Sequence, residues 1–279
     1  MTILDEKPRD TSNVTHSYHW FKQLKNKGRI TIRQFRRIMQ MIRVINEGFV
    51  LAYREGAFSQ PNQPEHTRLV RYFCRRLCET LDIEVTRHGP MPTEHALWVS
   101  NHISWLDIPV VGSQTRLFFL AKAEIQNWPL FGRLAQAGGT LFIKRGSGDS
   151  AVVKAHMSGF LKQKIPVLFF PEATTTDGRS IKRLHGKLLA AAIATQTFIQ
   201  PVVICYINVE GKLDQVVPFV DDQGFVENLL NVLALEKIRA HVMPLAAIST
   251  EGHTVESLTQ LLYARMCEGL QVLQQRVFV

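Results

Sequence analysis

The feature that most constrains the fold is a change of hydrophobic rhythm near residue 82. Short apolar or alternating runs, typical of strands, follow at 83–86, 96–100, 117–121, 141–144, 166–170, 199–208 and 239–247. Helical patterns lie between several of them, at 105–112, 149–163, 184–197, 225–237 and 254–275. Strands and helices in this order predict an α/β domain over residues 81–279, with a mostly parallel sheet flanked by helices.

The chain before this domain has a different character. Residues 1–16 are polar without periodicity and predict a flexible tail, and residues 17–80 predict a helical segment that associates with a membrane. No acidic residue occurs between Thr11 and Asn46, whereas eight lysines and arginines do. This stretch therefore carries almost all of the formal net charge of +9.

Residues 32–49 predict a basic amphipathic helix. One face carries the apolar residues Phe35, Ile38, Met39, Ile42, Ile45 and Phe49. The other carries Arg33, Arg36, Arg37, Gln40 and Arg43. Polar residues interrupt every window of the roughly 20 apolar residues that a spanning helix needs, so we expect the helix to lie on an anionic membrane surface. Packing against its own domain is the alternative, and the pattern fits both.

Composition restricts the partners and the compartment. The pI near 9.6 favours anionic partners, but no aromatic platform or zinc-type spacing accompanies the arginines, so nucleic acid is not expected. Four scattered cysteines and the lack of a signal peptide favour the reducing, cytoplasmic face of a membrane, with peripheral or monotopic attachment. Cys74 and Cys78 lie one helical turn apart, but no second pair completes a metal site, and no metal is expected.

The first candidate for chemistry follows the predicted strand 96–100. His102 stands at the strand exit, and Asp107 follows five residues later. A histidine with a pKa near 6.5 can accept a hydroxyl proton, and a carboxylate on its other ring nitrogen fixes the tautomer. Alone this spacing is weak evidence, because Ser104 and Asp107 also fit a helix capping box.

Further polar residues stand at other strand exits, where parallel sheets open into a crevice. Arg145 follows the strand 141–144, and Glu172, Ala173 and Thr174 follow the strand 166–170. Together with residues 200–203, these segments resemble the glycerolipid acyltransferase family, whose best-known members make phosphatidic acid from lysophosphatidic acid. The family's four ordered blocks correspond to residues 101–107, 142–145, 170–174 and 200–203, and the likeness covers about 80–250.

The resemblance implies a reaction and a set of roles. An acyl group would pass from acyl-CoA or acyl carrier protein to the free hydroxyl of a lysophospholipid, with His102 as general base and Asp107 as its partner. Because the donor is already an activated thioester, neither a covalent intermediate nor a cofactor is required. The resemblance also implies substrate-binding residues, with Arg145 as the phosphate ligand: Asn101, Lys122, Arg145, Glu172, Ala173 and Thr174.

The acyl acceptor stays open at this stage. The first choice is 1-acyl-sn-glycerol-3-phosphate, and the alternatives are lyso-ornithine lipid and a lysophosphatidylcholine-type lipid. A non-catalytic membrane lipid-binding protein is the alternative of another class, although both His102 and Asp107 are present. Other enzyme classes are not favoured, because the sequence has no Gly-x-Ser-x-Gly, His-Glu-x-x-His, Walker or Gly-x-Gly-x-x-Gly motif.

Two departures from the family pattern concern the third block. Ala173 replaces the usual glycine, which suggests either a backbone that avoids left-handed angles or a small strain. Thr175 stands where an arginine is common, so one phosphate contact is missing. Arg179, Lys182 or Arg183 would have to replace that contact, or the acceptor is not a simple phosphomonoester.

Overall fold

A single sheet of seven strands organises the molecule, in the order β1-β7-β6-β2-β5-β3-β4. The computed structural model describes residues 12–278 except 93–94, 128–129, 144–149 and 221–222, with side chains from residue 31 onward and without that of Ser150. The strands are β1 (Ile83–Arg87), β2 (Leu97–Ser100), β3 (Phe118–Lys122), β4 (Leu141–Ile143), β5 (Val167–Phe169), β6 (Ile199–Ile207) and β7 (Ile238–Pro244). Each coincides with one of the predicted strands.

The strand directions explain where a site can form. Strands β2 to β6 are parallel, whereas β7 runs antiparallel to β6 and β1 is parallel to β7. In the centre of the sheet, Trp98 of β2 lies opposite Leu168 of β5 on one side and Gln200 of β6 on the other. The segments after β2 and β5 therefore leave the same edge of the sheet, side by side. The predicted mostly parallel sheet is confirmed.

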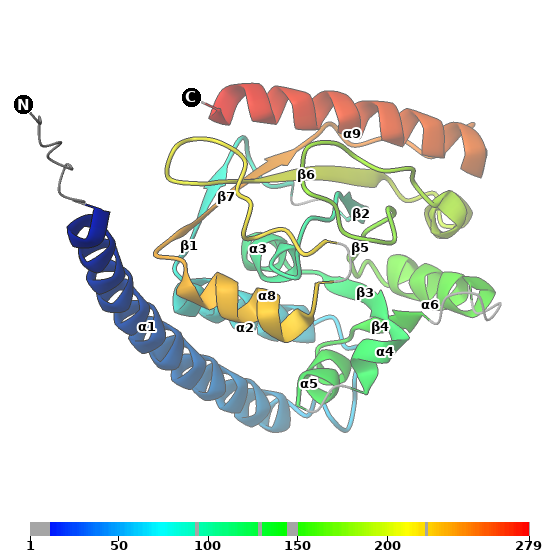
Figure 1. Cartoon of the computed structure of the whole chain (residues 1–279). Helices are drawn as coiled ribbons and strands as arrows, with labels where there is room; N and C mark the ends of the chain where they lie inside the picture. Colours follow the sequence, from blue (N-terminus) through cyan, green and yellow to red (C-terminus); the bar gives the residue numbers. More distant parts are fainter. Residues whose placement is uncertain (1–11, 93–94, 128–129, 144–149, 221–222, 279) are drawn as a thin grey trace, which may run out of the picture.

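Helices cover both faces of this sheet, as Figure 1 shows with α9 above it and α2 and α8 below. The helices are α1 (Ser12–Arg54), α2 (His66–Leu81), α3 (Asp107–Gln114), α4 (Ala123–Gln126), α5 (Phe131–Ala137), α6 (Ser150–Lys162), the 3-10 turn η1 (Gly186–Leu189), α7 (Ala190–Ala194), α8 (Phe225–Ala234) and α9 (Val255–Val277). One apolar core joins the sheet to α6, α7 and α9, and the other joins it to α2, α3 and α8.

Three parts of the chain differ from the sequence prediction. The helix α1 begins at Ser12, so the tail predicted over residues 1–16 is too long by its last five residues. The short helices α4 and α5 were not predicted, because runs of only four and seven residues carry too little periodicity. The helix predicted over 184–197 is a 3-10 turn followed by the five residues of α7.

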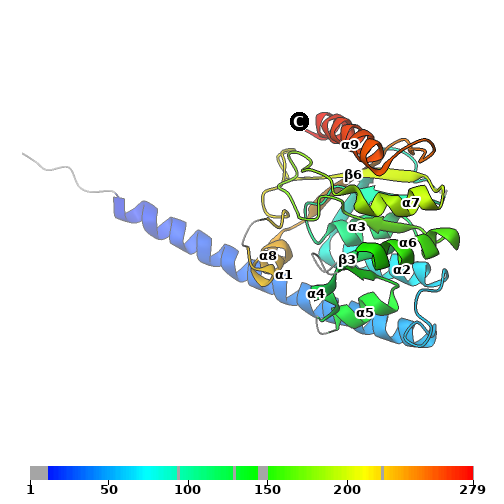
Figure 2. The same ribbon diagram turned by 90° about the vertical axis from the view of Figure 1, so that its right-hand side faces the viewer.

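Helix α1 runs along one side of the domain and projects beyond it, as Figure 2 shows. Part of its basic face is turned inward, in agreement with the alternative that this helix packs against its own domain. Arg37 is 1% exposed and donates hydrogen bonds to the carbonyl oxygens of Leu233, Leu235 and Glu236 at the end of α8. Burial lowers the pKa of Arg37, but the exposed carbonyl ends of a helix favour a cation there.

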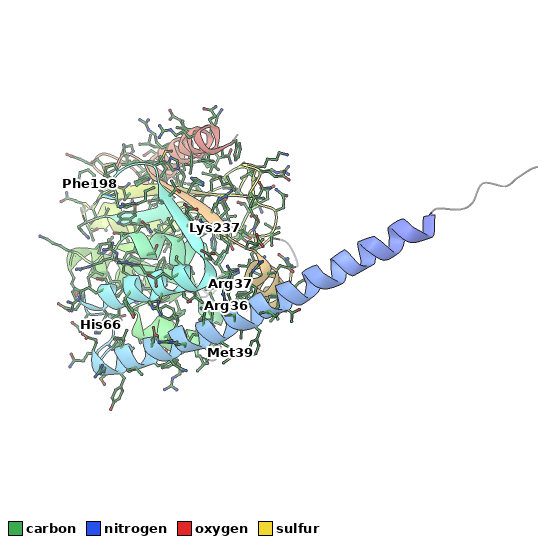
Figure 3. All side chains as sticks on the ribbon, turned by 90° about the vertical axis from the view of Figure 1, so that its left-hand side faces the viewer. Arg36, Arg37, Met39, His66, Phe198 and Lys237 are labelled. Atoms are coloured by element: carbon green, nitrogen blue, oxygen red, sulfur yellow. The ribbon has the colours of Figure 1, made fainter. Side chains whose placement is uncertain are left out.

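The outer side of α1 remains apolar. Figure 3 shows Met39 on the side away from the domain and Arg37 on the side of the domain. The exposed residues on this side form a surface that we call the α1 stripe: Ile32, Phe35, Met39, Ile42, Val50 and Tyr53. Within the described residues, no helix combines the length and the apolar character that a membrane crossing requires.

Candidate active site

The centre of the site is the side chain of His102, two residues beyond the end of β2. Its Nδ1 lies 2.7 Å from Oδ2 of Asp107, the first residue of α3. The Asp107 side chain is fully buried and the His102 side chain is 20% exposed. Because an ionised carboxylate only accepts, Nδ1 carries the proton and Nε2 keeps its lone pair.

The Asp107 carboxylate is held by several donors besides the imidazole. Its Oδ2 accepts hydrogen bonds from the backbone N–H groups of Ile103 at 2.7 Å and Ser104 at 3.0 Å. Its Oδ1 accepts one from the hydroxyl of Tyr206 at 2.8 Å. The bond from Ser104 is the one that the capping-box interpretation predicts, but α3 begins only at Asp107 and its N-cap residue, Leu106, has no side-chain cap.

Tyr206 was missed by the sequence analysis. It lies near the end of β6, is 2% exposed, and has a pKa raised well above its usual value by burial and by the neighbouring Asp107 charge. Its hydroxyl therefore stays protonated and donates to Asp107. Alternation along the strand was the signal that could have found it. Residues 202, 204 and 206 point to the same face of β6, and that face packs into the core that contains α3.

Glu172 binds the backbone of the site and does not bind the imidazole. Its Oε1 accepts from the N–H of His102 at 2.8 Å, and its Oε2 accepts from the N–H of Lys182 at 2.7 Å. The side chain is 3% exposed, and burial raises its pKa, although the two backbone donors act in the opposite direction. Glu172 thus joins the loop after β2 to the loop after β5.

Two further contacts fix His102 against the loop after β5. The ring of Phe170 stacks on the imidazole, with centroids 3.9 Å apart and an interplanar angle of 11°. The backbone N–H of Thr176 donates to the His102 carbonyl at 2.9 Å, and the Thr176 hydroxyl donates to the same oxygen at 3.2 Å. Together with Asp107 and Glu172, these contacts hold the ring, the amide and the carbonyl of His102.

Asn101, expected to bind substrate, is occupied within the sheet. Its side-chain amide donates to the carbonyl of Ile204 at 3.0 Å and accepts from the N–H of the same residue at 2.7 Å. These two bonds continue the pairing of β2 with β6 past the last residue of β2, and the side chain is 1% exposed. Asn101 therefore joins the His102 loop to the strand that carries Tyr206.

The remaining residues of the third block adopt distinct conformations. Ala173 has a φ of 60°, so its backbone is left-handed, and of the two expectations only that of a small strain is correct. Thr174 is exposed at the same turn. Thr175, which replaces the arginine common in the family, donates its hydroxyl to the carbonyl of Phe219.

The other two expected substrate ligands are not part of the cluster around His102. Lys122 is exposed at the end of β3, and the structure gives it no contact with His102 or Glu172. Arg145 lies outside the described residues, as does Lys144 before it. The structure thus brings together Asn101, His102, Asp107 and Glu172, with Ala173 and Thr174 on the adjoining turn.

This arrangement defines the chemical class of the protein. An imidazole with a buried carboxylate on Nδ1 and a free Nε2, at the carboxyl edge of a parallel sheet, is suited to take a proton from a hydroxyl nucleophile. Acyl transfer requires that step, and the sheet with helices on both faces is an architecture that hosts it. The fold and the site therefore indicate an acyl-transferring α/β enzyme.

Comparison with known proteins identifies the family. A family model for acyltransferases matches residues 82–205. Lyso-ornithine lipid O-acyltransferase from Pseudomonas aeruginosa is 41% identical over 189 residues, which cover 68% of this chain and 73% of that protein. The 1-acyl-sn-glycerol-3-phosphate acyltransferase of Neisseria meningitidis is 32% identical over 171 residues, covering 60% of this chain and 67% of that protein.

A solved structure supports the same fold. The crystal structure of the 1-acyl-sn-glycerophosphate acyltransferase PlsC from Thermotoga maritima superimposes with a TM-score of 0.66 at 17% identity, covering 89% of this chain and 98% of that one. The chain belongs to the acyltransferase family and is an acyltransferase.

Proposed function

We propose that the protein transfers a fatty acyl group from acyl-CoA or acyl carrier protein to the free hydroxyl of lyso-ornithine lipid. The observation that carries the chemistry is the 2.7 Å contact between His102 Nδ1 and Asp107, which leaves Nε2 as the base. The similarity to the Pseudomonas aeruginosa lyso-ornithine lipid O-acyltransferase supports this acceptor.

The proposed reaction has one proton cycle. Nε2 of His102 accepts the proton of the acceptor hydroxyl, and the oxygen attacks the thioester carbonyl carbon. The imidazolium is stabilised by the Asp107 carboxylate. The C–O bond forms, the C–S bond breaks, and the leaving thiolate takes the proton from Nε2. No resident metal or cofactor enters this scheme.

The third block supports an acceptor without a phosphate. A guanidinium offers a bidentate fork to phosphate, whereas the hydroxyl of Thr175 is already bonded to the carbonyl of Phe219. An ornithine headgroup presents an ammonium and a carboxylate in place of a phosphate. In this proposal Glu172 positions His102, and the exposed Thr174, on the turn that follows Glu172, is free to meet the acceptor.

A second acceptor, 1-acyl-sn-glycerol-3-phosphate, is favoured by a separate observation. The Neisseria relative of that name is 32% identical, and Arg145 occupies the position that binds phosphate in the family pattern. A lysophosphatidylcholine-type lipid is the third candidate, because threonine-rich forms of the third block resemble those of enzymes that acylate such lipids. The sequence alone makes 1-acyl-sn-glycerol-3-phosphate the first choice, whereas we place lyso-ornithine lipid first because the relative of that name is 41% identical.

An acceptor panel separates these candidates. Purified protein is incubated with radiolabelled acyl-CoA or acyl carrier protein and with lyso-ornithine lipid, lysophosphatidic acid or lysophosphatidylcholine. We expect lyso-ornithine lipid to give the highest kcat/KM. Product from lysophosphatidic acid alone would reverse the order of acceptors, and product from none of the three would rule out all three candidate acceptors.

We also propose that the α1 stripe lies on the cytoplasmic face of an anionic membrane. The six side chains are 46–80% exposed, and Arg36 and Arg43 are exposed beside them. A helix with an apolar face and neighbouring cations binds at the headgroup boundary.

Vesicle binding tests the membrane proposal. Replacing Phe35 and Met39 by Asn should reduce co-sedimentation with vesicles that contain phosphatidylglycerol by roughly tenfold or more, because both side chains lose apolar contact. The matched control replaces Val152 and Val209, which are also exposed but lie elsewhere. Equal sedimentation of both variants would assign the membrane contact to another surface.

A further inference from the structure

A cavity lies at the edge of the sheet opposite to His102. It has a volume of about 560 Å³, within the usual range of small-molecule sites. Its walls come from four separate segments: the start of α2, the end of α3, and the segments that precede β2 and β5. Arg71, Trp98, Gln114, Arg116 and Lys164 are among its lining residues.

The strand directions keep this cavity apart from the reaction. Arg116 precedes β3 and Lys164 precedes β5, whereas Glu172 follows β5 at the other edge. Trp98 lies inside β2, and His102 follows its end, roughly 13 Å further at the rise of an extended chain. The cavity is therefore not a part of the acyl-transfer site.

The charge of the cavity is one-sided. Arg71, Arg116 and Lys164 all line it, and no acidic residue occurs among its described lining residues. The Nε of Arg71 donates to the carbonyl of Ser113 at 3.2 Å, which leaves its two terminal nitrogens for other acceptors. Within the described part of the chain, neither Arg116 nor Lys164 takes part in an ion pair.

One residue of the cavity wall carries a buried donor that has no partner among the described residues. Trp98 is 1% exposed, and its indole N–H has no hydrogen-bond partner among the described residues. Buried donors are nearly always bonded, and an exception calls for an explanation such as an absent ion or ligand. A ligand with several anionic oxygens would neutralise the three cations.

We propose that this cavity binds a phosphate-bearing small molecule through Arg71, Arg116 and Lys164. A phosphate monoester carries up to two charges and three terminal oxygens, which match three cations better than a carboxylate does. Apolar lining by Met91, Ile165 and Pro166 accommodates an uncharged part of the same molecule. A soluble phosphate compound and a lipid headgroup share this chemistry.

Calorimetric titration of the full-length protein tests the proposal. The probes are inorganic pyrophosphate and monomeric dihexanoyl phosphatidic acid at low ionic strength. The cavity variant combines Arg116→Gln with Lys164→Gln, two exposed positions whose replacement leaves the core intact. The matched control combines Arg75→Gln with Lys154→Gln, exposed cations of α2 and α6 outside the cavity.

The outcomes show whether the cavity binds phosphate and whether that phosphate belongs to a soluble compound or to a lipid headgroup. We expect the cavity variant to lose one binding event, with affinity reduced on the order of tenfold or more, while the control binds like the wild type. Equal affinity for both probes would identify a free phosphate compound, and binding of the lipid probe alone would identify a headgroup. Unchanged binding by the cavity variant, or binding of neither probe by the wild type, overturns the proposal.

Discussion

The loop after β2 and the loop after β5 each bring a buried carboxylate to His102, but the two carboxylates do different work. Asp107 contacts the imidazole, so in the proposed reaction it would act on the proton. Glu172 contacts the backbone amide of His102, so it acts on the position of the residue. Burial raises the pKa of Glu172 in spite of its backbone donors. Both carboxylates lie next to His102, so their different roles follow from the atom of His102 that each one binds and not from distance.

Removing the residue that both loops hold should have the largest effect. We expect His102→Ala to lower kcat by about 10²–10⁴-fold, the usual contribution of a general base, without unfolding the protein. Activity is measured with labelled acyl thioester, and thermal unfolding checks the fold. The control is His156→Ala on the exposed face of α6, which should retain wild-type activity. Substantial turnover by a folded His102→Ala variant would remove the histidine from the mechanism.

Changing Glu172 tests the second loop. In Glu172→Gln, one backbone N–H of His102 or Lys182 faces the new amide N–H, which should cost about 1–3 kcal/mol of unfolding free energy. Urea unfolding at several pH values measures this cost. The control Glu227→Gln changes an exposed acid of α8 and should change stability little.

The pH dependence of that cost follows from the raised pKa of Glu172. As the pH rises above the ordinary glutamate pKa near 4.3, Glu172 loses its proton in the unfolded chain but keeps it in the folded protein. The free energy of unfolding of the wild type therefore decreases with rising pH until the raised pKa of the folded protein is passed. Glutamine does not titrate. The stability difference between wild type and Glu172→Gln should therefore be larger near pH 4.5 than at pH 7, and the opposite trend would contradict the assignment.

Tyr206→Phe tests how strongly the hydrogen bond to Asp107 supports the reaction. The variant removes one hydrogen bond to a buried carboxylate while keeping the ring, so we expect kcat to fall by about tenfold. The KM for acyl donor and acceptor should stay the same, since the hydroxyl contacts Asp107 and no substrate. Steady-state kinetics with both substrates varied measures kcat and the two KM values separately. A raised KM at unchanged kcat would place Tyr206 in substrate binding.

The smallest effect concerns the turn of the second loop. Because Ala173 is left-handed, Ala173→Gly should leave the free energy of unfolding unchanged or raise it by up to about 1 kcal/mol. The control is Ala264→Gly on the exposed side of α9, which should lose about 1 kcal/mol. Chemical denaturation compares the two, and equal losses would mean that the turn stores no strain.

Much of the fold was predictable because its signals are local. Each short apolar run became a strand, and the order of strands and helices was enough to predict a mostly parallel sheet. His102 and Asp107 were predictable because five residues separate them. Tyr206 was not, because it meets Asp107 only through the pairing of β6 with β2, 99 positions along the chain. The inward orientation of the Arg37 side chain could not be predicted for the same reason, because its partners at the end of α8 lie about 200 positions away.

The buried guanidinium of Arg37 has a mechanical consequence. It fastens α1 to the last carbonyls of α8, and the Asn228 side chain of α8 accepts a hydrogen bond from the indole of Trp105, three residues after His102. These contacts connect the long helix, through α8, to the segment that follows His102. If α1 lies on a lipid surface as proposed, its tilt would set the angle at which the segment around His102 faces that surface.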